Sequence, residues 1–130
     1  MGFPGKIQLS HHTGQRYADL EAPFWYVDLA GRKHLAKQGM VTDGLSIPRF
    51  LWRLFGAPYA SPYLAAGIIH DSYCKDARDI KHEGDITGAK QMRREADVLF
   101  REMLLYLGCG RVKAWSMYKG VRIGAMAEGL

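Results

Sequence analysis

The sequence predicts an α+β fold that is mostly α, with a small N-terminal antiparallel sheet followed by three to four helices. Up to residue 45 the chain consists of short pieces broken by glycine and proline, whereas from residue 46 apolar residues recur at helical spacing. The 130 residues, 48% of them hydrophobic, suit one globular domain with its own core. We therefore expect a single domain, 1–130, with residues 1–45 mainly β and loop and residues 46–130 helical.

Two strands are expected in the first part. The stretches are "FWYVDLAG" (24–31) and "KHLAKQGMVTD" (33–43). The first is rich in aromatic and β-branched residues, which favour extended backbone. Ala30-Gly31-Arg32 between them predicts a tight turn, so the two stretches should pair as an antiparallel hairpin.

Helix signals begin at "DGLSIPRFLWRLFG". Ser46 is suited to an N-cap, Pro48 to the first turn, and Gly56 to the end of this short helix. A second helix should start at Ser61 and Pro62 and run through "LAAGIIHDSYCKDARDIKH".

A polar break is expected at "EGDITG" (83–88), followed by a long helix over 89–108. That helix has a broad apolar stripe closed by Gly108, and "VKAWSMYKGVRIGAM" (112–126) predicts a final helix. Because the loop before residue 89 is short, the second and third helices should form a central antiparallel pair.

Bulk composition limits the function classes. No apolar run approaches the ~18 residues that span a bilayer, and the N-terminus lacks the pattern of a secretory signal. The formal charge is +5, but acidic residues are interleaved with the basic ones, so we expect a solvated surface rather than a dedicated nucleic-acid surface. Cys74 and Cys109 fall on different predicted helices and form no thiolate metal motif.

Several polar residues follow an apolar run in "AAGIIHDSYCKD". On a helix, His70, Tyr73 and Cys74 share one face, and Asp71 is turned about 100° away from His70. Antiparallel packing could bring Asp97, beside the apolar stripe of the next long helix, against His70. A carboxylate on one imidazole nitrogen would fix the tautomer and leave the other nitrogen as a base.

Asp43, in "GMVTDGLSIPR", occupies a predicted loop from which it could join the same pocket. It could equally cap the helix that follows. Because carboxylate oxygens suit hard divalent cations, Asp43 and Asp71 are the candidate metal ligands.

Structural interpretations remain open for these polar residues. His70 could bond a backbone carbonyl in a core, and Asp97 could form a surface ion pair with Arg93 or Arg101 at helical spacing. Arg122 could be a solvated charge or the counter-ion of a buried carboxylate.

Four segments together carry a family resemblance: "GMVTDGLSIPRFLW", "AAGIIHDSYC", "RREADVLFREML" and "MYKGVRIG". In this order and spacing they resemble domain of unknown function 1353, a family of small phage and prophage proteins. The matching positions are Thr42, Asp43, Ser46, Pro48, Arg49, His70, Asp71, Tyr73, Arg94, Asp97, Phe100 and Arg122. Two departures are Leu45-Ser46, where the family has Ala-Ser, and Cys74, where it has tyrosine. The resemblance implies a phage-encoded protein in the host cytoplasm, the virion or both, and it assigns no activity.

The His-Asp pair is also similar to the helix core of secreted calcium-dependent phospholipases. That similarity implies His70 as the base, Asp71 as a calcium ligand and Asp97 as the residue that orients His70. The glycine-rich calcium loop of those enzymes is absent, and "VTDGLS" is the one candidate substitute.

Two functions follow as expectations. The first is a hydrolase of lipid or cell-envelope esters, with catalytic residues His70, Asp97 and Tyr73 and a possible divalent metal, calcium before others, and no other cofactor. The second is a non-catalytic virion, tail or assembly component that contacts phage virion proteins or the host envelope, in which the His, Asp and Arg side chains form a structural network. Further residues expected at the polar site are Thr42, Ser46, Arg49, Arg94 and Arg122.

Overall fold

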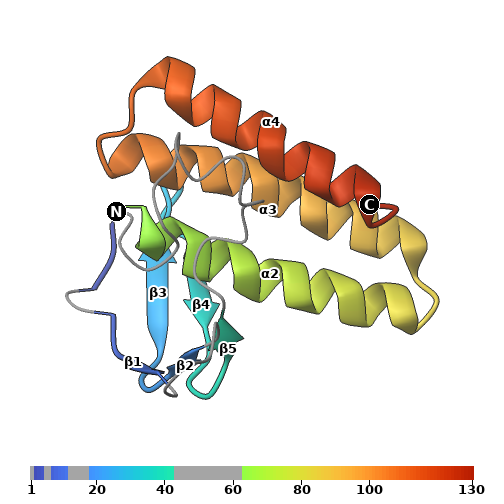
Figure 1. Cartoon of the computed structure of the whole chain (residues 1–130), viewed down its shortest axis with the longest axis horizontal. Coiled ribbons are helices and arrows are strands. Elements are labelled where there is room, and N and C mark those ends of the chain that lie inside the picture. Colours follow the sequence, from blue (N-terminus) through green and yellow to red (C-terminus); the bar gives the residue numbers. More distant parts are fainter. Residues whose placement is uncertain (1, 5–6, 12–17, 43–62) are drawn as a thin grey trace. The chain divides into compact units, whose positions relative to one another are not determined.

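A computed structural model of the chain describes residues 2–4, 7–11, 18–42 and 63–130 (Figure 1). These residues divide into two compact units, Met1–Ser72 and Tyr73–Leu130, and each is described by itself. The described helices and strands confirm a fold that is mostly α, with small antiparallel sheets before the helices. The predicted helix at 46–55 and the predicted cap at Ser61 lie outside the described residues.

The first unit contains two small antiparallel sheets. One has three strands in the order β1 (Leu9–His11), β2 (Ala18–Leu20), β5 (Val41–Thr42), and the other pairs β3 (Phe24–Val27) with β4 (Lys33–Ala36). The predicted hairpin is confirmed. The single strand expected over 33–43 is wrong, because the chain turns between Lys37 and Met40 and its two halves enter different sheets. Gly39, with φ +87°, supplies the left-handed residue that this turn requires.

The β3–β4 hairpin alternates buried and half-exposed residues along β3. Phe24 and Tyr26 are buried, and the Phe3 ring lies against both of them. In the register Phe24 faces Ala36 and Tyr26 faces His34. Aromatic side chains on one face of a two-stranded ribbon thus form its apolar side.

Helix α2 (Leu64–His82) begins in the first unit and ends in the second. Its apolar start is fully buried at Ala66, Ile68 and Ile69. The Ser72 hydroxyl donates a 3.5 Å hydrogen bond to the carbonyl of Leu35 on β4. The Ser72 hydrogen bond therefore links this part of the helix to the hairpin.

The second unit holds the end of α2 together with α3 (Ile86–Tyr106) and α4 (Arg111–Ala127), whose neighbours run in opposite directions (Figure 1). Helix α3 starts inside the expected polar break of 83–88. Asp85 caps it, with its carboxylate accepting from the backbone N–H of Gly88. The cap offsets the low helix propensity of Gly88, which is why the helix begins earlier than the glycine suggested.

The core of the second unit combines large and small side chains. Phe100, Met103, Leu104 and Met117 are almost completely buried. A further cluster consists of three buried alanines and the buried Leu130, with two half-buried residues packed against them: Ala77, Ala89, Ala125, Leu130, Ile80 and Met92. Cys74 and Cys109 are both buried, consistent with side chains that pack as small apolar groups. None of the described helices is both long enough and apolar enough to span a membrane.

Candidate functional site

His70 and Asp71 lie next to each other on α2, and both are buried. Their exposed fractions are 5% and 4%, and the preceding residues Ile68 and Ile69 are fully buried. Placing ionisable groups in apolar surroundings costs free energy unless hydrogen bonds or charges compensate. The pair is therefore buried at the end of the apolar run that the sequence pattern indicated.

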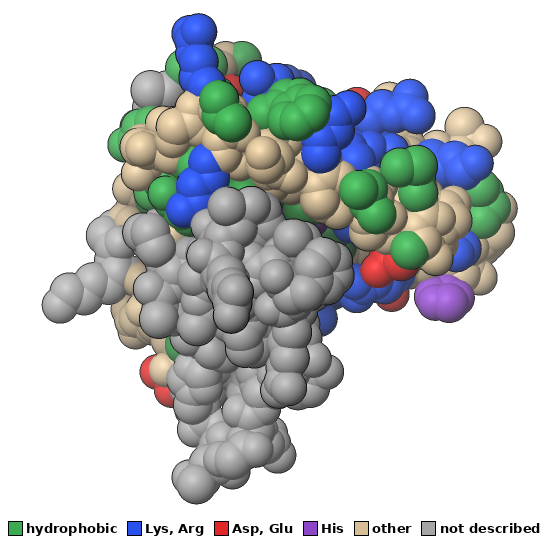
Figure 2. Space-filling view, turned by 45° about the horizontal axis from the view of Figure 1, so that its top comes forward, with side chains coloured by type: hydrophobic (Ala, Val, Ile, Leu, Met, Phe, Trp, Pro, Cys, Tyr) green, Lys and Arg blue, Asp and Glu red, His purple; other side chains and the backbone are tan. Residues whose placement is uncertain are grey.

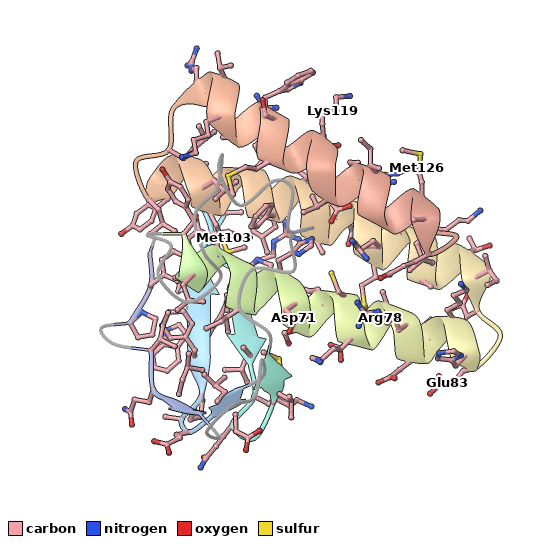
Figure 3. The ribbon with its side chains drawn as sticks, in the orientation of Figure 1. Asp71, Arg78, Glu83, Met103, Lys119 and Met126 are labelled. Atoms are coloured by element: carbon pink, nitrogen blue, oxygen red, sulfur yellow. The ribbon has the colours of Figure 1, made fainter. Side chains whose placement is uncertain are left out.

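Tyr73 and Cys74 follow on the same helix, one turn after His70. Tyr73 is half-buried and Cys74 is buried, so the face predicted for His70, Tyr73 and Cys74 is largely removed from solvent. Asp71 and Arg78, labelled in Figure 3, both project from α2.

Asp97 on α3 is the most completely buried acidic side chain among the described residues, with no exposed surface. Arg93 Nε donates to its Oδ1 at 3.2 Å, and Arg122 Nη1 on α4 donates to its Oδ2 at 2.8 Å. The pairing with Arg93 was expected, but at the surface; the pair is buried because α4 covers this side of α3. Arg122 is the counter-ion of a buried carboxylate, which confirms one of its two interpretations.

Arg93 extends this contact toward the C-terminus. Its Nη1 donates to Glu128 Oε2 at 3.0 Å, and its Nη2 donates to the carbonyl of Val121 at 3.3 Å. Arg78 Nη2 on α2 donates to Glu128 Oε1 at 3.2 Å. We call these five charged residues the Asp97 cluster: Arg78, Arg93, Asp97, Arg122 and Glu128. The cluster joins the end of α2, α3 and the end of α4.

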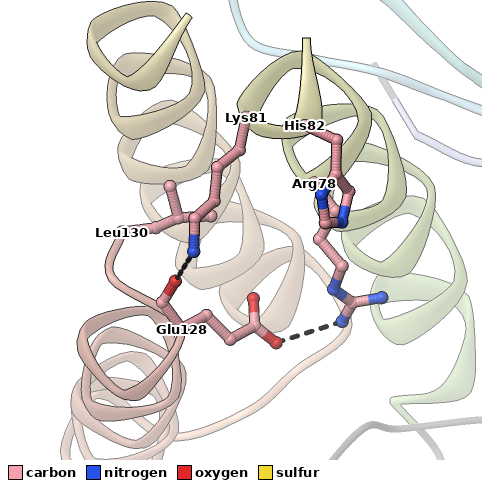
Figure 4. Close-up of a pocket in the computed structure, with 5 residues that line it drawn as sticks. All are labelled: Arg78, Lys81, His82, Glu128 and Leu130. Carbon is pink, nitrogen blue, oxygen red and sulfur yellow. Dashed lines mark hydrogen bonds and ion pairs between the residues drawn. The ribbon is translucent and has the colours of Figure 1, made fainter. Parts of the chain in front are cut away.

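A small pocket of about 220 Å³ lies at one end of the Asp97 cluster (Figure 4). It is lined by Arg78, Lys81, His82, Glu128 and Leu130. Lys81 Nζ donates to the backbone carbonyl of Glu128, and the Glu128 carboxylate accepts from Arg78. Glu128 is thus bound by both Arg78 and Lys81, the two basic residues drawn beside it in the pocket lining.

A second polar pair, the buried Asp28 and the half-buried His34, lies in the hairpin and was not predicted. Asp28 Oδ2 is 2.8 Å from His34 Nε2, and its Oδ1 accepts from the backbone N–H groups of Ala30 and Arg32. The hydrogen bond from His34, followed by that from Arg32, lowers the pKa of Asp28 below its ordinary 3.8. The sequence contained a signal for this pair: an Asp lies beside the predicted turn and a His follows six residues later. A hairpin brings residues at such positions together.

The other residues predicted for the polar site do not enter the Asp97 cluster in the described part of the chain. Thr42 ends β5, and Asp43, Ser46 and Arg49 lie outside the described residues. Arg94 is exposed on α3, and among the described residues it is the adjacent Arg93 that enters the Asp97 cluster. The alternation of faces along a helix explains this, since neighbouring residues point about 100° apart.

The metal site remains a prediction. In the described part of the chain, no three His, Cys, Asp or Glu side chains lie close enough to hold a metal ion together. The Asp71 carboxylate is there, whereas its predicted partner Asp43 is outside that part. The predicted hydrogen bond between His70 and Asp97 also stays a prediction, because the two residues belong to different units.

Comparisons with known proteins give relatives of unassigned function. The chain is 34% identical over 65 residues to uncharacterized protein y4jT of Sinorhizobium fredii (strain NBRC 101917 / NGR234), covering 50% of this chain and 19% of that protein. It is 44% identical over 55 residues to uncharacterized protein y4iH of the same organism, covering 42% of this chain and 23% of that protein. The chain thus spans about a fifth of the length of these two relatives. No solved structure is significantly similar to it. A family model described as protein of unknown function (DUF1353) matches residues 18–121, and the chain therefore belongs to that family.

Proposed function

We propose that the domain is a small hydrolase of lipid or cell-envelope esters, with His70 as its general base. One observation carries the proposal: His70 and Asp71 are adjacent and buried in an otherwise apolar part of α2. Ionisable groups kept in such surroundings are concentrated at functional sites, where low solvent exposure strengthens their electrostatic effects. The similarity of the His-Asp helix to calcium-dependent phospholipases supports the same chemistry.

The reaction needs only water and the ester. The neutral imidazole of His70 accepts a proton from water while the water oxygen bonds to the carbonyl carbon. The bond from that carbon to the alcohol oxygen then breaks, and the imidazolium returns the proton to the leaving oxygen. Tyr73, one turn later on the same helix, is proposed to position the substrate or the imidazole.

A divalent cation at Asp71 belongs to the proposal in a limited form. Calcium takes ~6–8 oxygen ligands, and Asp71 alone contributes at most two, so the described residues do not form a complete calcium site. Asp43 is the predicted additional ligand. A bound cation would stabilise negative charge on the carbonyl oxygen.

The test is hydrolysis of short-chain phosphatidylglycerol and phosphatidylcholine, measured as released acid in calcium and in chelator. His70→Gln should lower the rate roughly 10²- to 10⁴-fold, the usual contribution of a positioned general base. His82→Gln is the matched control, because His82 is exposed on the same helix. Asp71→Asn and chelator should both reduce the rate if the cation is part of the site. A wild-type protein without activity on either ester, or a folded His70→Gln protein with the wild-type rate, would reject the hydrolase.

A second candidate function is a non-catalytic component of a phage particle or of its assembly. The Asp97 cluster favours it, because the carboxylate oxygens of Asp97 are bound by two arginines in the manner of a structural ion-pair network. In that case the protein should co-purify with intact particles, and Asp97→Asn should lower the particle yield because it disrupts the Asp97 cluster.

A further inference from the structure

Helix α4 carries a row of exposed apolar side chains. Val112, Trp115, Ile123 and Met126 are exposed by 81%, 50%, 64% and 64%. Residues turn by about 100° along a helix, so these four and Lys119 fall within an arc of roughly 80°. We call these five residues the α4 stripe.

The α4 stripe lies opposite the face that α4 packs into the second unit. Ala114, Met117 and Ala125 are buried, and they lie on the other side of the helix. Figure 3 shows Lys119 and Met126 pointing outward from α4, away from α3. In the space-filling view, hydrophobic side chains and Lys or Arg side chains alternate on this part of the surface (Figure 2). The side chains of the stripe therefore do not take part in the core that α4 helps to form.

The charge of α4 is entirely positive. Its sequence, RVKAWSMYKGVRIGAMA, contains four Lys or Arg and no Asp or Glu. Arg122 binds Asp97, whereas Lys119 and Arg111 are exposed. Lys119 Nζ lies 5.4 Å from the centre of the Trp115 ring, so a cation and an amphipathic aromatic ring occupy the middle of the stripe. This combination of side chains is complementary to a surface with an apolar interior and negatively charged groups on its outside.

We propose that the α4 stripe binds the surface of anionic lipid membranes. Apolar side chains of a basic amphipathic helix enter the boundary between headgroups and acyl chains, while Trp lies at headgroup level and Lys reaches the phosphates. A second copy of the chain fits less well, because a symmetric contact along the stripe would bring the Lys119 side chains of both copies together. The inference is independent of catalysis, since a protein without hydrolase activity should bind equally.

The experiment is co-sedimentation of the full chain with vesicles of phosphatidylcholine alone or mixed equally with phosphatidylglycerol. The protein should bind the anionic vesicles more tightly than the neutral ones, and this preference should weaken as salt rises. The fluorescence of Trp115, identified as the emission lost in Trp115→Phe, should shift to shorter wavelength on binding. Lys119→Glu should weaken binding about tenfold or more, because it replaces an attracted charge with a repelled one. Val112→Ser/Ile123→Ser should weaken it further by removing buried apolar area.

Matched controls come from the first unit. Leu29→Ser/Leu35→Ser removes two exposed apolar side chains, and Lys37→Glu makes the same charge change at an exposed lysine. These variants should bind as the wild type does, and all variants should keep its circular dichroism. The proposal is overturned if anionic vesicles bind no protein, or if the stripe and control variants bind equally. It is also overturned if the stripe variants instead dissociate a dimer seen by sedimentation, or abolish binding to nucleic acid, while vesicle binding is absent.

Discussion

Asp97 shows how single residues set the stability of the second unit. Its carboxylate has no exposed surface and is bound by guanidinium groups from α3 and α4. The partners offset the free energy of desolvating this charge. Removing one partner of a buried ion pair is strongly destabilising, because the other charge then stays buried without compensation.

Asp97→Asn should therefore lower the free energy of unfolding by about 3–5 kcal/mol, since two arginines lose their common counter-ion. Urea unfolding followed by circular dichroism measures this. Glu95→Gln, at an exposed position of the same helix, is the control and should change stability by less than about 0.5 kcal/mol. Equal, small effects of both substitutions would show that the Asp97 cluster contributes little to folding.

Asp28 predicts a pH dependence for the first unit. Because its folded pKa lies below the ordinary 3.8, the carboxylate stabilises the fold above that pH. That stabilisation is lost as the pH falls from 3.8 through the lower folded pKa. The melting temperature of the wild type should thus fall more steeply than that of Asp28→Asn over this acidic range. Parallel melting curves of the two proteins would contradict the assignment.

How far the sequence could reveal these residues depended on distance along the chain. Asp97 with Arg93 followed from helical spacing, and His70 with Asp71 followed from polar residues after an apolar run. Glu128 was missed, because nothing local connects it to Arg93, 35 residues away. The Asp28–His34 pair was missed because it depends on hairpin register rather than on either residue alone.

At the scale of elements, the start of α3 depends on one cap. The Asp85 carboxylate accepts from Gly88, and a Cβ at residue 88 would collide with that carboxylate. Asp85→Ala should cost about 0.5–2 kcal/mol of stability, because a helix N–H loses its acceptor. Asp76→Ala, exposed within α2, is the control for loss of an acidic side chain. The melting temperatures of the two variants measure the difference. An equal change in both would show that the Asp85 cap does not stabilise α3.

Elements with strong periodicity were predictable, and their exact ends were less so. The apolar stripe located α3, and Gly108, with φ +89°, ended it as expected. The start of α3 was predicted too late, because Gly84 and Gly88 have low helix propensity and propensity takes no account of the Asp85 cap. The stretch 33–43 kept its extended character, but its division between two sheets is decided by Gly39 and by pairing with distant strands.

At the scale of the whole molecule, composition and periodicity predicted the order of sheet and helices and the mostly α class. They did not predict the three-stranded β1-β2-β5 sheet as such, because pairing between strands far apart in sequence leaves no local pattern. The expected single domain remains a prediction; α2 passes through both compact units, so neither unit contains all of that helix.

Whether His70 performs chemistry is decided by one comparison: the rate of phospholipid ester hydrolysis by His70→Gln and by the wild type, at equal concentrations of folded protein. We expect a fall of at least about a hundredfold, with an unchanged circular dichroism spectrum and full activity in His82→Gln. Equal rates in the wild type and a folded His70→Gln protein, or no hydrolysis by the wild type in calcium, would contradict a catalytic role for the buried pair.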